Sequence, residues 1–502
     1  MAGKRETLTE SSPASQGVDS RGISAFLDAL EAEPGFEPHS LMILRHGKIV
    51  AQGWWAPFAP DRRQLLYSLS KSFTGAAAAF AYAEGKLRLD DPLVSYFPEF
   101  EAEITDPRSR AILVRHALSM ASGHSTEQWD KAVERDPAEP VRGFLLGGPD
   151  REPGSVFAYN QPCTYSIAAI VQRVTGQRLV DYLRPRLFEP LGIGEVAWQQ
   201  QPAGRDIAFT GLFATTDAIA KLGQLYLQRG VWEGERLLPE DWVEQATRPQ
   251  VANAELGWDP DWVQGYGFQF WMSRHGYRGD GAYGQYCLVL PEQDVVIAIT
   301  SETHDMQRVL DLAWEHLLSA FDEGPAADPE TARQADAALA RRLEELVVPP
   351  CAGSAAPSEL AAGLGPDGLV CTARAGGDGE PVPELRLEQS PDKPGDWNLT
   401  IVEDADREEQ LEAGYEKFPR GTMTLRLTPG GGWNVAVPDE TPTAVSGGWV
   451  DANTLRVHVL FLETPNSLDV TCDLAQRTVE SQLRTTPLRT AALAWARAPL
   501  AQ

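Results

Sequence analysis

The sequence predicts an α+β fold, with an antiparallel sheet flanked by helices and split by an inserted helical subdomain, followed by a small all-β domain. Apolar, strand-like runs occur near the start of the chain and again between residues 266 and 300, with helical patterns between them. Beyond residue 347, short alternating runs and turn residues replace the helices. A chain of 502 residues is also too long for one hydrophobic core. We expect three parts: residues 1–322 with a helical insertion at about 92–255, a linker and helix at 323–347, and a β domain at 348–502.

The first predicted elements are a hairpin and a helix. Residues 41–44 and 49–55 are apolar runs, and Gly47 between them is a turn residue. Residues 68–83 follow, and their high alanine content favours a helix that ends at Gly85.

A mainly helical region comes next, and then the strand pattern returns. Helical periodicity stops at Gly176 and again at Gly230, both of which suit the end of a helix. Because strands lie on both sides of this region, a cleft between the sheet and the helical insertion is the expected binding site. The remaining predicted elements of the first two parts are strands at 266–272, 282–290 and 295–300 and helices at 306–321 and 330–346.

The last part of the chain is predicted to be an antiparallel barrel or sandwich. Alternating runs occur at 385–387, 397–402, 423–427 and 455–461, separated by turn-rich spacers. This part contains no catalytic pattern. It is interpreted as a structural or substrate-shaping cap, or as an independent module that binds sugar or peptide.

Composition excludes several classes of partner. The formal net charge of -27 argues against nucleic acid or an anionic membrane, which need clustered Lys and Arg. There is no apolar run of about eighteen residues and no hydrophobic leader, so a cytoplasmic location is expected. The five cysteines lack C-x-x-C spacing and the eight histidines lack H-x-x-x-H spacing, so neither a metal nor another cofactor is expected.

The most informative motif is the S-x-x-K spacing of Ser68 and Lys71. Residues three apart share a helix face, so the amine can reach the hydroxyl oxygen. Serine needs a base to become a nucleophile, and a lysine that loses part of its charge can act as one. Ser390 and Lys393 have the same spacing, but they lie among prolines in a predicted surface loop, where no helix would align them.

Several motifs together resemble the serine β-lactamase and penicillin-binding-protein superfamily. The groups that the chain resembles most are class C β-lactamases, family VIII carboxylesterases, D-amino-acid peptidases and 6-aminohexanoate-dimer hydrolases. The resemblance covers roughly residues 15 to 320 and is specific because its parts occur in the expected order. The matching stretches are residues 68–75, 84–92, 114–124, 153–160, 211–217, 230–234, 280–286 and 291–292.

The resemblance implies roles for individual residues. Ser68 would attack a carbonyl carbon, and Lys71 or Tyr159 would take its proton; which of the two is the base stays open. A phenol between two cations can have a lowered pKa, which would suit Tyr159 to this role. The backbone N–H groups of Ser68 and Ala282 would form the oxyanion hole.

Two positions depart from the family pattern. Gln161 stands where the second motif usually has asparagine, and it could hydrogen-bond Lys71 or a substrate amide. The third motif aligns with Gly279, Asp280 and Gly281, so it lacks the usual cation that faces a substrate carboxylate. An inward-pointing Asp280 would oppose an anionic substrate further.

These observations predict a serine hydrolase that cleaves neutral or small esters or amides through an acyl-enzyme on Ser68. Three aromatic residues, Trp129, Trp271 and Tyr283, are further candidates to line the cleft, although each could instead be buried in the hydrophobic core. The alternatives are a D-amino-acid peptidase, a β-lactamase or an acyltransferase on the same scaffold, and a binding scaffold without catalysis. The oligomeric state is not predicted.

Overall fold

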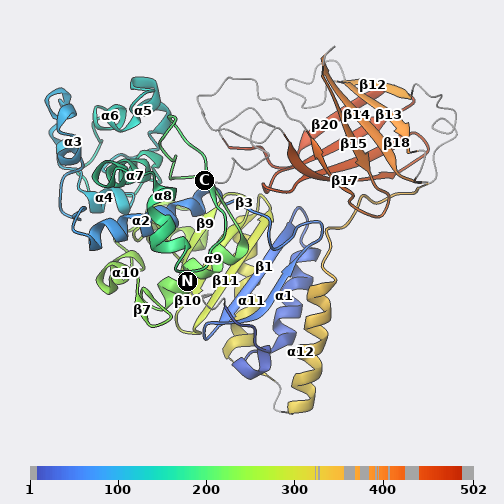
Figure 1. Ribbon diagram of the computed structural model, residues 1–502, viewed down its shortest axis with the longest axis horizontal. Coiled ribbons are helices and arrows are strands. Elements are labelled where there is room, and N and C mark those ends of the chain that lie inside the picture. Colours follow the sequence, from blue (N-terminus) through green and yellow to red (C-terminus); the bar gives the residue numbers. More distant parts are fainter. Residues whose placement is uncertain are drawn as a thin grey trace, which may run out of the picture.

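The computed structural model consists of a sheet with helices on both faces and a separate β domain beside it (Figure 1). The sheet with its helices confirms the predicted α+β class of the first domain. The structure describes residues 8–322, 324–325, 328–355, 368–373, 384–390, 393, 395–404, 407–423 and 440–488.

The central sheet joins strands from both ends of the first domain. Strand β1 pairs antiparallel with β11, with Ile43 opposite Ile297. The early hairpin and the late strands therefore form one sheet, and the helical region between them is an insertion, as predicted. The order across the sheet is β2 (Lys48–Trp54), β1 (Glu37–Arg45), β11 (Val295–Glu302), β10 (Gln285–Leu290), β9 (Tyr277–Gly281) and β8 (Trp271–Met272).

Alternation along the strands gives the sheet two apolar faces. In β1, Leu41 and Ile43 belong to one buried cluster, whereas Met42 and Leu44 belong to the cluster of the helical region. The first face is covered by α1 (Ser20–Ala32) and α11 (Met306–Asp322), and α12 (Pro329–Glu344) packs against α1 and β2. Because α12 packs on the first domain, we propose that the β domain begins at about residue 348.

The other face of the sheet carries the helical region. Gly176, with a φ of 71°, ends α7 as expected for a left-handed C-cap. Among the described residues, no helix is long and apolar enough to cross a lipid bilayer. The helices are α2 (Ser70–Ala83), α3 (Pro107–Arg110), α4 (Val114–Leu118), α5 (Trp129–Arg135), α6 (Pro140–Leu145), α7 (Gln161–Thr175), α8 (Leu179–Leu183), α9 (Thr216–Leu227) and α10 (Glu240–Ala246). Short strands accompany them: β3 (Gln64–Leu65), β4 (Ala197–Trp198), β5 (Leu212–Ala214), β6 (Val231–Trp232) and β7 (Glu235–Arg236).

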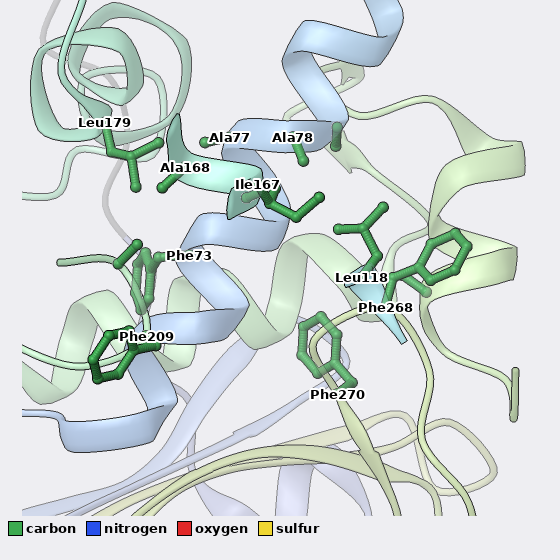
Figure 2. Close-up of a cluster of buried hydrophobic side chains, with 14 of the residues drawn as sticks. Phe73, Ala77, Ala78, Leu118, Ile167, Ala168, Leu179, Phe209, Phe268 and Phe270 are labelled. Atoms are coloured by element: carbon green, nitrogen blue, oxygen red, sulfur yellow. The ribbon is translucent and has the colours of Figure 1, made fainter. Parts of the chain in front are cut away.

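Helix α2 is buried in the centre of the helical region. Figure 2 shows Ala77 and Ala78 of α2 beside Ile167 and Ala168 of α7, with Phe73 lower on the same helix. Small side chains let the two helices approach closely, and the surrounding apolar side chains exclude water. The helix that follows Ser68 is therefore rigidly held.

The sequence misplaced the strands before β11. Of the strand predicted at 266–272, only Trp271–Met272 pairs regularly, and the predicted strand 282–290 begins at Gln285. Strand β9 was missed because Tyr277–Gly281 contains two glycines, an arginine and an aspartate, a composition that disfavours strands. Its glycines are required by contacts with the Ser68 turn, described below.

The β domain is a single nine-stranded sheet that closes almost into a barrel, so of the two predicted architectures the barrel is observed. Neighbouring strands run antiparallel except β12 and β20, which pair in parallel. A bridge between Gly414 and Ser446 brings β15 next to β17 and nearly closes the sheet. The strand predicted at 423–427 lies outside the described residues beyond Met423. The strands are β12 (Leu369–Ala373), β13 (Glu384–Gln389), β14 (Trp397–Asp404), β15 (Arg407–Ala413), β16 (Arg420–Met423), β17 (Thr441–Trp449), β18 (Thr454–Phe461), β19 (Ser467–Asp473) and β20 (Thr478–Leu483).

A buried ionic cluster joins the two domains. Glu37 of β1 accepts hydrogen bonds from His39 (3.2 Å), from His458 of the β domain (3.0 Å) and from Arg484 (2.8 Å). His458 also contacts Asp469 at 2.6 Å. Burial favours the neutral imidazole, but the two carboxylates raise the pKa of His458 to about 9. Burial would raise the pKa of Glu37, but the two histidines lower it well below its usual range.

This cluster predicts a pH-dependent stability. Because the pKa of His458 is raised from 6.5 to about 9, its contribution is complete below about pH 6.5 and is lost as the pH rises through 9. The lowered pKa of Glu37 gives a contribution that is present above about pH 4.5 and lost as the pH falls. We expect the thermal midpoint to decrease between pH 6.5 and 9, with a loss on the order of 3 kcal/mol, and His458→Gln to flatten this slope.

The half-buried His316 provides a matched control, because His316→Gln removes a histidine outside the cluster. A slope unchanged in His458→Gln, or flattened equally in His316→Gln, would contradict the assignment.

Candidate active site

Ser68 lies in a single 3-10 turn, Tyr67–Leu69, directly before α2. The turn is sharp: Tyr67 has a φ of 45°, which non-glycine residues adopt rarely. Buried side chains flank Ser68 on both sides, while Ser68 itself is partly exposed. The strained turn thus presents one hydroxyl at the surface of a cavity.

Lys71 lies under this hydroxyl. Its Nζ donates to Ser68 Oγ at 3.0 Å and to the carbonyl oxygen of Phe209 at 2.7 Å. The ammonium also lies over the ring of Tyr159, 4.6 Å from its centroid. Only 1% of Lys71 is exposed, so these contacts determine the position of the amine. The S-x-x-K spacing therefore brings the two groups together as predicted from the helix geometry.

Tyr159 lies beside Ser68 and Lys71, but its pKa differs from our expectation. Burial raises the pKa of the phenol well above its usual value, and the negative charge of Asp280 raises it further. Hydrogen bonding to Ser68 and the charge of Arg278 oppose this shift without overcoming it. The expectation of a lowered pKa was wrong, because burial of the phenol and the nearby carboxylate of Asp280 outweigh the groups that lower the pKa. The phenol is therefore neutral at pH 7 in the free protein.

The described residues around Ser68 form an open cavity of about 700 Å³. Four predicted site residues besides Ser68 line it: Tyr159, Gln161, Asp280 and Ala282. Ser68 and Ala282 lie at the same cavity, as an oxyanion hole formed by their N–H groups requires. The other lining residues are Trp258, Asp259, Trp262, Trp271, His304, Asp305, Met306 and Leu488.

Asp280 points into the cavity, but it is not an isolated charge. Its Oδ2 accepts from Arg278 Nε at 2.9 Å, and Arg278 is fully buried under the rings of Trp262 and Trp271. Burial raises the pKa of Asp280, while Arg278 and, more weakly, Lys71 lower it. A cation is thus present in this strand, but Asp280 lines the cavity and Arg278 does not.

The two glycines of β9 do not line the cavity; they allow close packing against the Ser68 turn. A Cβ at Gly281 would lie 2.0 Å from the carbonyl oxygen of Leu66. A Cβ at Gly279 would lie 2.4 Å from Leu69 Cδ1 and 2.6 Å from Ser72 Oγ. The space that a third-motif lysine would need is therefore filled by the nucleophile helix.

The aromatic candidates separate into three environments. Trp271 lines the cavity, and its indole N–H makes no hydrogen bond of normal geometry within the described residues. Trp129 packs in the core against Tyr165 and Phe209. Tyr283 has a φ of 67° in the turn between β9 and β10, and its hydroxyl donates to the carbonyl oxygen of Thr486 in the β domain.

Tyr159→Phe is expected to lower kcat about 10²–10⁴-fold, because it removes a proton carrier but keeps the ring under the Lys71 ammonium. The measurement is the steady-state rate with a short ester, alongside the thermal midpoint. Tyr266→Phe is the matched control, since Tyr266 is buried against Tyr159 and Trp271 but does not line the cavity. Equal rates in Tyr159→Phe and the parent protein would exclude the phenol from the reaction.

Sequence reasoning missed several residues of this site. These residues lie in loops or at the ends of helices and strands. They are the carbonyl group of Phe209 and the side chains of Trp258, Trp262, His304, Met306 and Leu488. They are not at a fixed spacing from Ser68 in the sequence. A backbone carbonyl group is present in every residue, so the pattern of side chains does not show which one binds Lys71. The second S-x-x-K pair cannot be assessed as a unit, because residues 391 and 392 between Ser390 and Lys393 lie outside the described residues.

The chain is similar in sequence to known hydrolases. The chain is 29% identical over 286 residues to the 6-aminohexanoate-dimer hydrolase of Paenarthrobacter ureafaciens, covering 53% of this chain and 73% of that relative. It is 27% identical over 214 residues to esterase EstB of Burkholderia gladioli, covering 37% of this chain and 54% of the relative. A solved structure, a putative beta-lactamase from Bacteroides dorei, shares the fold with a TM-score of 0.50 at 15% identity, covering 60% of this chain and 99% of that one.

The family profile named Beta-lactamase matches residues 23–320, which is more than half of the chain. The chain therefore belongs to the Beta-lactamase family of serine hydrolases. This result confirms the resemblance inferred from the motifs.

Proposed function

We propose that the protein hydrolyses carboxylic esters or amides of small, uncharged substrates through an acyl-enzyme on Ser68. The observation that carries this proposal is the 3.0 Å contact between Lys71 Nζ and Ser68 Oγ at the wall of an open cavity. A buried amine in hydrogen-bond reach of a partly exposed hydroxyl is the arrangement that activates serine.

The reaction proceeds in two acyl transfers. Ser68 Oγ attacks the carbonyl carbon, and its proton passes to Lys71 in its neutral amine form or to Tyr159 in its phenolate form. The carbonyl oxygen becomes negative and is stabilised by the N–H groups of Ser68 and Ala282. The leaving alcohol or amine takes the proton as the bond to the carbonyl carbon breaks. Water then attacks the acyl-enzyme and gives its proton to the same base. The base passes this proton to Ser68 Oγ as the acyl bond breaks, which releases the acid and restores the hydroxyl of Ser68.

The charges around the cavity favour the binding of uncharged substrates over the binding of anionic substrates. Asp259, Asp280 and Asp305 line it, and the Gly279 position has no space for a lysine. A substrate carboxylate would meet like charge there, which costs free energy of binding. Three indoles, of Trp258, Trp262 and Trp271, supply the apolar surface instead.

Covalent labelling tests the proposal directly. A small alkyl fluorophosphonate reacts with an activated serine by forming an O–P bond and releasing fluoride, while the hydroxyl proton goes to the base. We expect one phosphonyl group per chain, located by peptide mass spectrometry on the tryptic peptide that contains Ser68. A label absent at that peptide, together with no hydrolysis of short p-nitrophenyl esters or amides, would overturn the proposal.

The same carboxylates favour one alternative, a peptidase for substrates with a free amino group. The chain is 30% identical over 169 residues to the D-aminopeptidase of Brucella anthropi, covering 31% of that relative. Faster turnover of D-alanine p-nitroanilide than of its N-acetyl derivative would support this alternative.

Two further alternatives have their own tests. A stable adduct or turnover with penicillin would indicate a β-lactamase, and amide products formed with an added amine would indicate acyl transfer.

A further inference from the structure

One wall of the Ser68 cavity comes from the β domain. After β20 ends at Leu483, the chain continues along the first domain, and Leu488 lines the same cavity as Ser68 and Tyr159. Among the described β-domain residues, it is the only one at this cavity. Leu488 is an exposed residue, with 52% of its surface accessible. An exposed apolar side chain at a cavity wall offers a surface that a ligand can cover.

Hydrogen bonds to the main chain hold this segment in place. His304 Nε2 donates to the carbonyl oxygen of Arg484 at 2.9 Å, and Asn466 Nδ2 donates to that of Thr485 at 3.0 Å. The hydroxyl of Tyr283 donates to the carbonyl oxygen of Thr486. Three successive carbonyl groups are thus fixed just before Leu488, so the position of this wall is set by both domains.

The same contacts reach the residue that precedes the nucleophile. Tyr67 donates from its hydroxyl to Asn466 Oδ1 at 3.0 Å, and its ring packs edge-on against Tyr283 at 5.4 Å. Tyr283 directly follows Ala282, the second proposed oxyanion donor. The β-domain segment, the Ser68 turn and the oxyanion turn therefore form one packed unit.

The chemistry of the surrounding wall is apolar. Met306 and the indoles of Trp258, Trp262 and Trp271 line the cavity along with Leu488. The carboxylates of Asp259 and Asp305 lie on exposed residues at the same cavity. An uncharged chain or ring of several carbons would cover the apolar side chains, whereas a two-carbon acyl group would leave most of them in water.

We propose that residues 484–488 form a fixed wall of the substrate cavity and that Leu488 is a specificity contact for an apolar group of the substrate. This inference rests on the proposed function of Ser68. It assigns the β domain a role in substrate choice, and it names the substrate class as esters or amides that carry an aliphatic chain of several carbons.

The test compares substrates that differ only in chain length. For Leu488→Ala we expect kcat/KM for p-nitrophenyl octanoate to fall about 5- to 10-fold, because the substitution removes the isopropyl group of Leu488 from the contact. The value for p-nitrophenyl acetate should change less than about twofold. Leu488→Met should restore the long-chain rate, because methionine supplies a similar apolar volume.

Val370→Ala is the matched control, because Val370 is an exposed apolar residue of the same domain that does not line the cavity. Equal losses for short and long substrates in Leu488→Ala would indicate a disturbed fold, and unchanged ratios would show that Leu488 makes no contact; either result overturns the inference.

A binding measurement separates this inference from the proposed function. In the Ser68→Ala background, the affinity for N-octylacetamide measured by calorimetry should fall about 5- to 10-fold when Leu488 is also changed to alanine. This readout needs no turnover, so it holds even if the labelling of Ser68 fails. Loss of labelling with an intact Leu488 effect would overturn only the proposed chemistry. Normal labelling with no Leu488 effect would overturn only the wall.

Discussion

Ser68→Ala is expected to lower the turnover of a short p-nitrophenyl ester by about 10⁴-fold or more, with little change in stability. Ser68 lines the cavity and is partly exposed, whereas Lys71 is only 1% exposed, so we expect the amine not to replace the hydroxyl as the nucleophile. Ser68 is partly exposed, and removal of its Oγ leaves Lys71 still bonded to the carbonyl group of Phe209. The measurement is kcat/KM for parent and variant, with the thermal midpoint as a check of folding.

The chain offers a matched control for this experiment in Ser390, the serine of the second S-x-x-K spacing. Ser390→Ala should leave the rate unchanged, since the backbone N–H of Ser390 bonds to Asp396 in the β domain and the residue is absent from the Ser68 cavity. Activity retained by Ser68→Ala but lost by Ser390→Ala would show that the wrong motif has been assigned.

Lys71→Met is expected to lower kcat about 10³- to 10⁴-fold. Methionine fills a similar volume but neither donates to Ser68 Oγ nor carries the charge that lies over the Tyr159 ring. The carbonyl oxygen of Phe209 would lose its hydrogen bond from Lys71, which costs about 1–3 kcal/mol of stability. A combined measurement of kcat and unfolding free energy separates these two effects.

Lys221→Met is the matched control, because Lys221 is also a buried lysine, 2% exposed, but it pairs with Asp217 and Gly192 away from the cavity. It should lose stability and keep its kcat. Lys71→Arg then decides the role of the amine: partial activity would show that a positive charge suffices, whereas a loss as large as in Lys71→Met would identify Lys71 as the proton acceptor. A normal kcat in Lys71→Met would exclude both roles.

The helix containing Lys71 shows why part of the site was predictable. Side chains at i and i+3 of a helix meet whatever surrounds the helix, so the Ser68–Lys71 contact follows from local spacing. Its alanine content likewise predicted a helix, which the structure places at α2, packed against α7. Tyr159 was found by a motif that resembles a family, and that motif gave no information on its pKa.

Strand β9 shows why other parts were not predictable. Gly279 and Gly281 disfavour a strand when judged by propensity, yet they are needed where β9 meets Leu66 and Leu69. The pKa of Asp280 was also not predictable from the sequence, since it depends on burial and on the neighbouring Arg278. Contacts between distant segments override local preference in both cases.

The sequence by itself determined three features of this protein: a serine and a lysine one helical turn apart, membership of a family of serine hydrolases, and a separate β part. Only the tertiary structure decided what surrounds that pair. The neutral phenol of Tyr159, the filled space at Gly279 and the wall at Leu488 arise from segments far apart in the chain. The physical reason is that short-range spacing constrains which side chains share a helix face, whereas burial, charge and cavity shape are set by packing between elements.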